Sequence, residues 1–349
     1  MSPVGDADQN ELPFPGGDLA FRVAGTADRE WFFKSGRQTA EDIANGLAAV
    51  GGRLQACERI LDFGCGCGRV LLWLKDLAGA TALYGSDIDA TAIEWAREHL
   101  PYVTFTVNNG LPPTEFPDAF FDFVYSQSVF THLDETYQDA WLAELQRIVR
   151  PGGRLLLSVN GEQSFQQLEK TRQSQGIPSG ALRIARDMKG LLFITDDQWG
   201  GMFPDFYHSS FDTPAYVFAH WSRYFRIHCY IPRGSLSFQD FVLLERTAPG
   251  ESAETPAGRI PTSGEAIREA ATLVGLGPSA KRPDQPGRLW ILARKVVKRI
   301  LRHHSSHERE VHSAVVEALR GLDVNYRDLQ QQIRQQDERI SQLEKERAR

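Results

Sequence analysis

Cysteine is scarce in this sequence, and long apolar runs are absent from it. The four cysteines, Cys57, Cys65, Cys67 and Cys229, are too few and too irregularly spaced for a disulfide framework, which favours a reducing compartment. No stretch approaches the roughly 18 apolar residues that a membrane span needs. The acidic N-terminal residues, rich in Pro and Gly, lack the basic and apolar regions of a secretory signal. We therefore expect a cytoplasmic protein.

A large positive charge is also absent. The formal net charge of −6 argues against a general nucleic-acid binder, and 42% apolar residues suffice for a packed core. A chain of 349 residues can hold one large domain with appendages, or two domains. The motif G-x-G-x-x-G of dinucleotide-binding proteins is missing from the glycine-rich segment described next.

Residues 59–70 contain the most informative pattern. A short apolar run ends at Asp62, three glycines alternate with small residues at Gly64, Gly66 and Gly68, and apolar residues at helical spacing follow. This order predicts a buried strand, a tight loop and a helix. Glycine permits φ > 0 and lets a ligand approach the backbone, and the N–H groups of the following turn can face it. Cys65 and Cys67, with no second pair, have poor zinc spacing and are interpreted as small loop residues, so we expect no metal.

The segment Asp62-x-Gly64-x-Gly66-x-Gly68 resembles the cofactor motif of class I S-adenosylmethionine-dependent methyltransferases. The resemblance spans roughly residues 20–247. It implies S-adenosyl-L-methionine as cofactor and assigns the contact residues of the loop, Asp62, Gly64, Cys65, Gly66 and Gly68.

Strand and helix patterns alternate along this region. Strands are expected at 59–63, 81–87, 102–107, 120–126 and 154–159, and helices at 21–52, 134–149 and 214–221. Such alternation predicts an α/β fold with a doubly wound, mostly parallel sheet. The segments 224–231 and 237–245 read as a closing antiparallel hairpin. The resemblance implies seven strands in all. The aromatic run at 31–37 is similar to a segment that covers the cofactor in such enzymes, but core packing explains it equally well.

Further cofactor residues are expected where the strands end. Asp87 lies 23 positions past Gly64, a distance suited to a carboxylate that binds both ribose hydroxyls, while Asp89 is the better helix cap. Asn109 stands where the family usually has an Asp for the adenine amino group, and an amide oxygen can accept the same bond. Ile88, Gly110 and Gln127 complete the expected cofactor set.

The sequence defines the residues that bind the methyl acceptor less clearly than those that bind the cofactor. Residues 160–212 interrupt the alternation, and we interpret them as a lid that builds the acceptor pocket or as a surface elaboration. A hydroxyl acceptor needs a base, for which His132 and His208 are candidates, although either is also compatible with a structural role. Tyr207 and Asp205 are placed to orient the acceptor.

The segment from Ser128 to Trp141, together with Gln239-Asp240, is similar to methyltransferases associated with bacterial surface-polysaccharide assembly. That resemblance implies a sugar hydroxyl of a glycan or glycolipid as acceptor. Another small molecule or a lipid is an open alternative as the methyl acceptor. A nicotinamide-dependent dehydrogenase, which the glycine spacing opposes, and a non-enzymatic, cofactor-binding scaffold are open alternatives to a methyltransferase.

The C-terminal third has a different composition. Residues 1–20 are expected to form a flexible arm, 21–247 the methyltransferase domain and 248–287 a Pro-rich linker. Residues 288–304 pattern as a basic amphipathic helix, suited to the inner membrane surface or to docking on protein. Residues 311–349 carry apolar positions at four-three spacing, which predicts a coiled coil and a homodimer, the alternative being a solvated helix.

Overall fold

The computed structural model describes Val4, residues 11–195 and residues 203–248, and every structural statement below refers to these residues. The chain divides into two units, 1–258 and 259–349, and only the first contains described residues. The predicted amphipathic helix (288–304), the coiled coil (311–349) and nearly all of the linker therefore lie outside the described residues.

The secondary structure follows the predicted alternation of strands and helices. The elements are α1 (Gly17–Ala24), α2 (Arg29–Ala48), η1 (Leu54–Ala56), β1 (Arg59–Phe63), η2 (Leu71–Leu77), β2 (Ala82–Asp87), α3 (Ala90–His99), β3 (Val103–Val107), β4 (Phe121–Ser126), η3 (Phe130–His132), α4 (Glu135–Ile148), β5 (Val149–Val159), α5 (Glu162–Ser174), α6 (Gly180–Lys189), β6 (Leu191–Ile194), β7 (Ser209–Asp212), α7 (Pro214–Trp221), β8 (Arg226–Ser235) and β9 (Gln239–Glu245).

Seven strands form one sheet in the order β3-β2-β1-β4-β5-β9-β8. The first five are parallel, and β9 runs antiparallel to both β5 and β8. The predicted doubly wound, mostly parallel seven-stranded sheet with a closing hairpin is thus confirmed.

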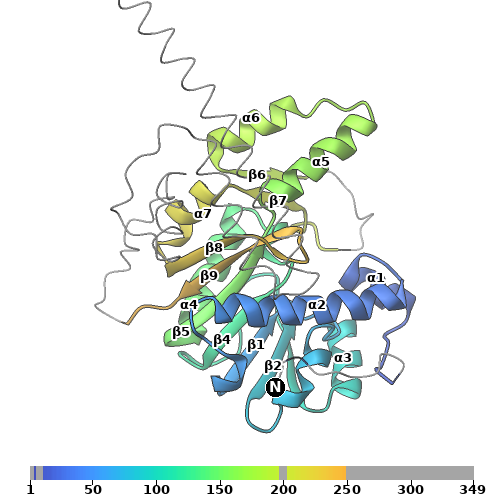
Figure 1. The fold of residues 1–349 in the computed structure, drawn as a ribbon, viewed down its shortest axis with the longest axis vertical. Helices are drawn as coiled ribbons and strands as arrows, with labels where there is room; N and C mark the ends of the chain where they lie inside the picture. Colours follow the sequence, from blue (N-terminus) through green and yellow to red (C-terminus); the bar gives the residue numbers. More distant parts are fainter. Residues whose placement is uncertain (1–3, 5–10, 196–202, 249–349) are drawn as a thin grey trace, which may run out of the picture. The chain divides into compact units, whose positions relative to one another are not determined.

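Both faces of the sheet are covered. Because neighbouring residues of a strand point to opposite faces, Ile60 packs in one core cluster and Leu61 in another. The first cluster joins the sheet to α1, α2, η2 and α3, and the second joins it to α4 and α7. Figure 1 shows α2 crossing one face of the sheet.

Side-chain caps begin four of the helices. The carboxylates of Asp28, Asp89 and Asp134 and the hydroxyl of Thr213 accept hydrogen bonds from backbone N–H groups of the first turn. The prediction that Asp89 caps a helix is correct, and each cap marks where its helix starts.

Three local predictions differ from the structure. The first helix begins at Gly17, inside the predicted arm. The segment after the glycine loop is a 3₁₀ helix, η2, buried on nearly all sides. Strand β5 starts at Val149 rather than Arg154, because Phe121 of β4 already pairs with Val149 before a register shift in the ladder.

The segment 160–212 adds a small substructure. Helices α5 and α6 pack with a two-stranded sheet, β6 and β7, around Phe165, Ile194 and Phe211, and Figure 1 shows them grouped together. The buried guanidinium of Arg186 lies 4.6 Å from the ring centre of Phe165 and pairs with Glu162. This insertion therefore has a core of its own.

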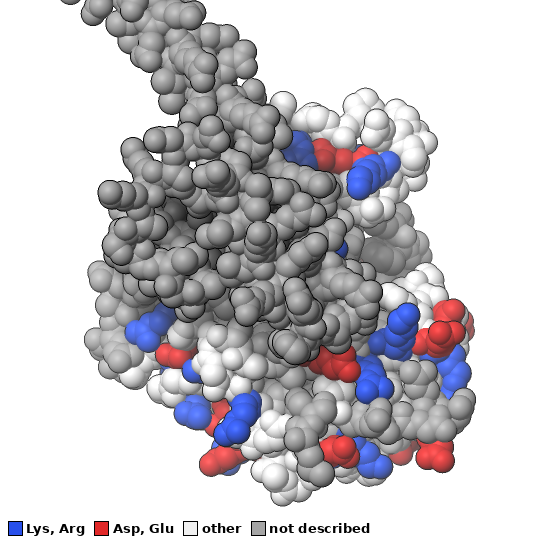
Figure 2. All heavy atoms as spheres, viewed as in Figure 1, with Lys and Arg blue, Asp and Glu red and all other residues white. Residues whose placement is uncertain are grey.

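No helix among the described residues is long and apolar enough to span a membrane. On the face shown in Figure 2, acidic and basic side chains of the described residues are interspersed rather than separated by sign.

Candidate functional site at the carboxyl edge of the sheet

A cavity of about 370 Å³ opens where the parallel strands end. The loops after β1, β2, β3 and β4 meet there. A ligand site is expected at this edge, because in a doubly wound sheet ligands bind at the carboxyl ends of the strands, where the strand order reverses. The cavity is lined by Arg22, Val23, Phe63, Gly64, Gly66, Asp87, Ile88, Asp89, Ala90, Asn108, Asn109, Gly110, Gln127, Ser128, Val129, Leu133, Trp141, Phe203, Pro204, Phe206 and Tyr207.

The glycine loop requires glycine at all three alternating positions. Gly64, Gly66 and Gly68 have φ of 82°, 53° and 78°, in the left-handed region that residues with a Cβ rarely adopt. A Cβ on Gly66 would lie 2.7 Å from Cγ2 of Val23, so α1 packs directly on the loop. The sequence pattern therefore reflects both backbone conformation and close packing.

We expect Gly64→Ala to lower the free energy of unfolding by at least about 2 kcal/mol. The left-handed conformation alone costs an alanine about 1 kcal/mol or more, and the new Cβ would lie 2.1 Å from Cγ2 of Val129. Urea denaturation measures the change. In a Val129→Ala background, which removes the colliding methyl group, Gly64→Ala should lower the free energy of unfolding only by the cost of the left-handed conformation. An equal cost in both backgrounds would show that the two residues do not collide.

Asp87, at the end of β2, is fixed by two backbone N–H groups. Gly66 N donates to one carboxyl oxygen (2.7 Å) and Asp89 N to the other (2.8 Å). Burial raises the pKa of Asp87, while these hydrogen bonds lower it. Each oxygen keeps a further acceptor position, because a carboxylate offers about four. The carboxyl group is thus held at the cavity wall in the arrangement expected for two adjacent hydroxyls.

Three of the predicted loop contacts do not line the cavity. Asp62 is buried behind the loop and accepts a hydrogen bond from the hydroxyl of Tyr125 at 3.0 Å. Cys65 is buried with its sulfur 2.9 Å from where a Cβ on Gly85 would lie, and Gly68 faces Leu100. These three residues contact the protein interior rather than the cavity, so they support the loop from behind.

The loops after β2 and β3 agree better with the prediction. Ile88, Asn109 and Gly110 line the cavity. The indole N–H of Trp141 donates to the carbonyl oxygen of Gly110 at 3.1 Å, which fixes this loop against α4.

The end of β4 carries a polar network that the sequence did not reveal. The amide nitrogen of Gln127 donates to Oε1 of Gln239 at 2.8 Å, and its Oε1 accepts from the hydroxyl of Ser235 at 2.6 Å. Ser128 has φ of 60°, and Ser158 Oγ accepts its backbone N–H at 2.7 Å. A non-glycine residue in this conformation costs about 1–3 kcal/mol, and such residues cluster at functional sites. The network joins β4 to the β8–β9 hairpin beside the cavity.

The three candidate catalytic residues form one cluster, of which only Tyr207 lines the cavity. The ring of His132 stacks on Tyr207 with centroids 4.0 Å apart. His132 Nδ1 lies 2.8 Å from the carbonyl oxygen of His208 and must be the donor, because that oxygen can only accept. Burial lowers the pKa of His132 to about 4, so the imidazole is neutral at pH 7. His208 packs edge-on against Phe193.

Helix α1, rather than the aromatic run at 31–37, lies at the cavity. Phe32 and Phe33 of the aromatic run at 31–37 are fully buried in the core, so core packing explains them. The cavity is instead lined by Arg22 and Val23 of α1, and Arg22 pairs with Asp89 at 3.2 Å. The pairing of α1 with a helix cap 67 positions later left no signal in the sequence.

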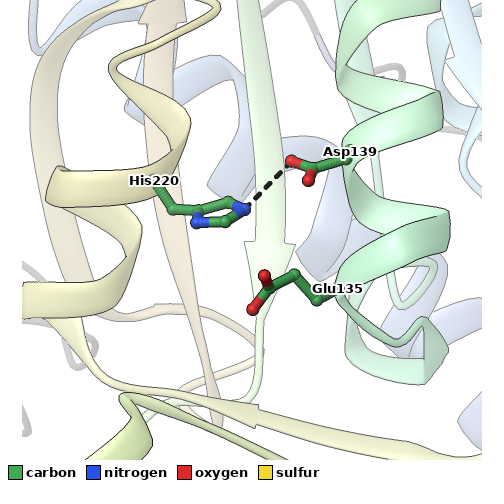
Figure 3. Close-up of side chains that lie close together, drawn as sticks. All are labelled: Glu135, Asp139 and His220. Atoms are coloured by element: carbon green, nitrogen blue, oxygen red, sulfur yellow. Dashed lines mark hydrogen bonds and ion pairs between the residues drawn. The ribbon is translucent and has the colours of Figure 1, made fainter.

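A separate cluster joins α4 to α7. Glu135, Asp139 and His220 point toward one another, with ligand-type atoms within 4.8 Å (Figure 3). His220 Nε2 lies 3.0 Å from Asp139 Oδ1, and the guanidinium of Arg223 contacts both residues. The positive charge of the Arg223 guanidinium already lies beside these side chains, so we interpret the cluster as an ion-pair network rather than a metal centre.

Comparison with known proteins supports the predicted class of enzyme. Residues 60–153 match the family model described as a methyltransferase domain. The segment is 28% identical over 111 residues to methyltransferase GfsG of Streptomyces halstedii, covering 30% of this chain and 38% of that protein. It is 35% identical over 105 residues to ribosomal protein L11 methyltransferase of Paraburkholderia xenovorans, covering 30% and 33%. The chain thus spans about a third of the length of these relatives.

Solved structures give a weaker likeness. The PH0226 protein of Pyrococcus horikoshii has a TM-score of 0.40 at 16% identity, covering 58% of this chain and 86% of its own. An S-adenosylmethionine-dependent methyltransferase of Methanosarcina mazei also has a TM-score of 0.40, at 20% identity, covering 55% and 93%.

Proposed function

We propose that this protein is an S-adenosylmethionine-dependent methyltransferase that methylates a hydroxyl group of a glycan or glycolipid. The observation that carries the class is the arrangement of Asp87 and the glycine loop, in the segment that matches the methyltransferase family model. A Cβ at Gly64 or Gly66 would collide with Val129 or Val23, both of which line the cavity beside the loop. These features fit the nucleoside part of the cofactor.

The cofactor supplies an electrophilic methyl group on a sulfonium, and the protein's task is to align an acceptor with it. The acceptor oxygen forms the new bond to the methyl carbon, the carbon–sulfur bond breaks, and the hydroxyl proton passes to a base. His132, which lies behind Tyr207 and is neutral at pH 7, stays our candidate base, and a proton from an acceptor in the cavity would reach it past Tyr207. Tyr207 would orient the acceptor between this imidazole and the cavity.

An uncharged acceptor is favoured by the polar groups near the end of β4. Gln127 and Ser128 line the cavity, and their amide and hydroxyl groups belong to the uncharged hydrogen-bonded network there. Among the described residues that line the cavity, Arg22 is the only Lys or Arg, and it is paired with Asp89. Amides and hydroxyls beside aromatic rings suit a sugar better than a phosphorylated or carboxylated acceptor.

Calorimetric titration of the full-length protein tests the class. We expect micromolar binding of S-adenosylmethionine and none of NAD⁺ or NADP⁺. Transfer of a labelled methyl group to glycan acceptors, compared with phospholipid and protein fractions, tests the substrate. Binding of NAD⁺ instead would overturn the class, and binding of neither would favour a scaffold.

A further inference from the structure

Phe206 lies where the insertion meets the loop after β3. Its ring stacks on Tyr137 of α4, with centroids 4.6 Å apart and planes inclined by 18°. Its Cε1 lies 2.6 Å from where a Cβ on Gly110 would be. Gly110 does not adopt a left-handed conformation, whereas other loop glycines do. Close approach of Phe206, rather than backbone conformation, therefore accounts for glycine at position 110.

Tyr207 occupies the neighbouring part of the same wall. Its ring is stacked between His132 and Phe203, with centroids at 4.0 and 4.5 Å. Tyr207 and Asp87 line one cavity. Burial, and secondarily the Asp87 carboxyl, raises the pKa of Tyr207, so the phenol stays neutral and can donate a hydrogen bond.

We propose that Phe206 and Tyr207 bind the cofactor: Phe206 forms a wall of the nucleobase slot beside Gly110, and Tyr207 closes the ribose end near Asp87. This inference rests on the proposed function. It extends the role of the insertion, since the segment expected to build the acceptor pocket also completes the cofactor site, and it gives Tyr207 a contact with the ribose in addition to its place beside the acceptor.

The chemistry of the nucleobase and of the ribose supports this assignment. A nucleobase presents a flat π-face, and aromatic side chains pack well against such faces. Asn109, the candidate partner of the adenine amino group, precedes Gly110 and lines the same cavity. Phe206 is held from behind by Tyr137, so its position is set before a ligand enters. Asp87 and Tyr207 would then face the ribose.

Titration of full-length variants with adenosine and with S-adenosylmethionine tests the proposal. Phe206→Ala should weaken the binding of both ligands to the same extent, by about ten-fold, because the lost contact is to the nucleobase that they share. Phe206→Leu, which keeps most of the packing volume, should lose less. Phe193→Ala is the matched control, because Phe193 belongs to the insertion but does not line the cavity. Unchanged affinity of Phe206→Ala for adenosine would overturn the assignment.

Gly110→Ala provides an independent readout. In the wild type the new Cβ should displace Phe206 and weaken the binding of both ligands. In a Phe206→Ala background the same change should have little further effect, whereas additive losses would contradict the contact. Failure of the wild type to bind S-adenosylmethionine would overturn the proposed function and this inference together. A wild type that binds, with Phe206 variants that bind equally, would overturn this inference alone.

Discussion

Replacing Asp87 with alanine is expected to weaken the binding of S-adenosylmethionine at least about 100-fold. Hydrogen bonds to a charged group contribute about 1.5–3 kcal/mol each, and the carboxylate is placed to accept two from the ribose. The substitution also removes the acceptor of Gly66 N–H and Asp89 N–H, which hold the glycine loop to the end of β2. Isothermal titration calorimetry measures the loss.

Two variants make the Asp87 result specific. Asp87→Asn keeps one acceptor oxygen and should lose less than Asp87→Ala. Asp89→Asn removes a carboxylate from the same cavity but keeps a good helix cap for α3, so its affinity should stay within a few-fold of wild type. Equal losses in the Asp87 and Asp89 variants would indicate a general electrostatic effect rather than a ribose contact.

Asp62→Asn is expected to become more stable relative to wild type as the pH rises, by about 3 kcal/mol between pH 5.5 and 8. Burial raises the pKa of Asp62 from 3.8 to about 8, with Asp87 adding to the rise and Tyr125 and Arg69 opposing it. The folded wild type therefore holds its proton across this range while the unfolded chain has lost it. Stability falls as pH rises through this window, by about 1.4 kcal/mol per unit.

Asparagine is the suitable probe because it is neutral at every pH and keeps an oxygen for the Tyr125 hydroxyl, which donates to Asp62. Urea denaturation at several pH values gives the difference between the two proteins. Burial also raises the pKa of Asp212, to about 7, but that residue is present in both and its contribution cancels. A parallel pH dependence in wild type and Asp62→Asn would show that Asp62 is ionised in the folded state.

The fold and part of the candidate site could be predicted because they depend on local patterns. Alternation of apolar residues, caps and glycines predicted each strand of the large sheet and the carboxyl edge where its loops meet. The different roles of Asp87 and Asp89 followed from their positions relative to the strand end and the helix start, and the structure shows Asp89 as the cap. The 3₁₀ character of η2 was missed, since periodicity alone does not separate a tight helix from an α-helix.

The sequence by itself determined the sheet, the left-handed glycine loop and the acid that ends the second strand, because each depends on residues close together in the chain. Only the tertiary structure decided which side chains share the cavity. Phe206 meets Gly110, Gln127 meets Gln239, and α1 covers Gly66 through contacts between residues far apart in sequence. The tertiary structure also shows that Tyr207 lines the cavity and that His132 and His208 do not. Such pairings depend on how the insertion and the N-terminal helix pack against the sheet. Periodicity shows which face of an element is buried, but it does not show which distant residue packs against that face.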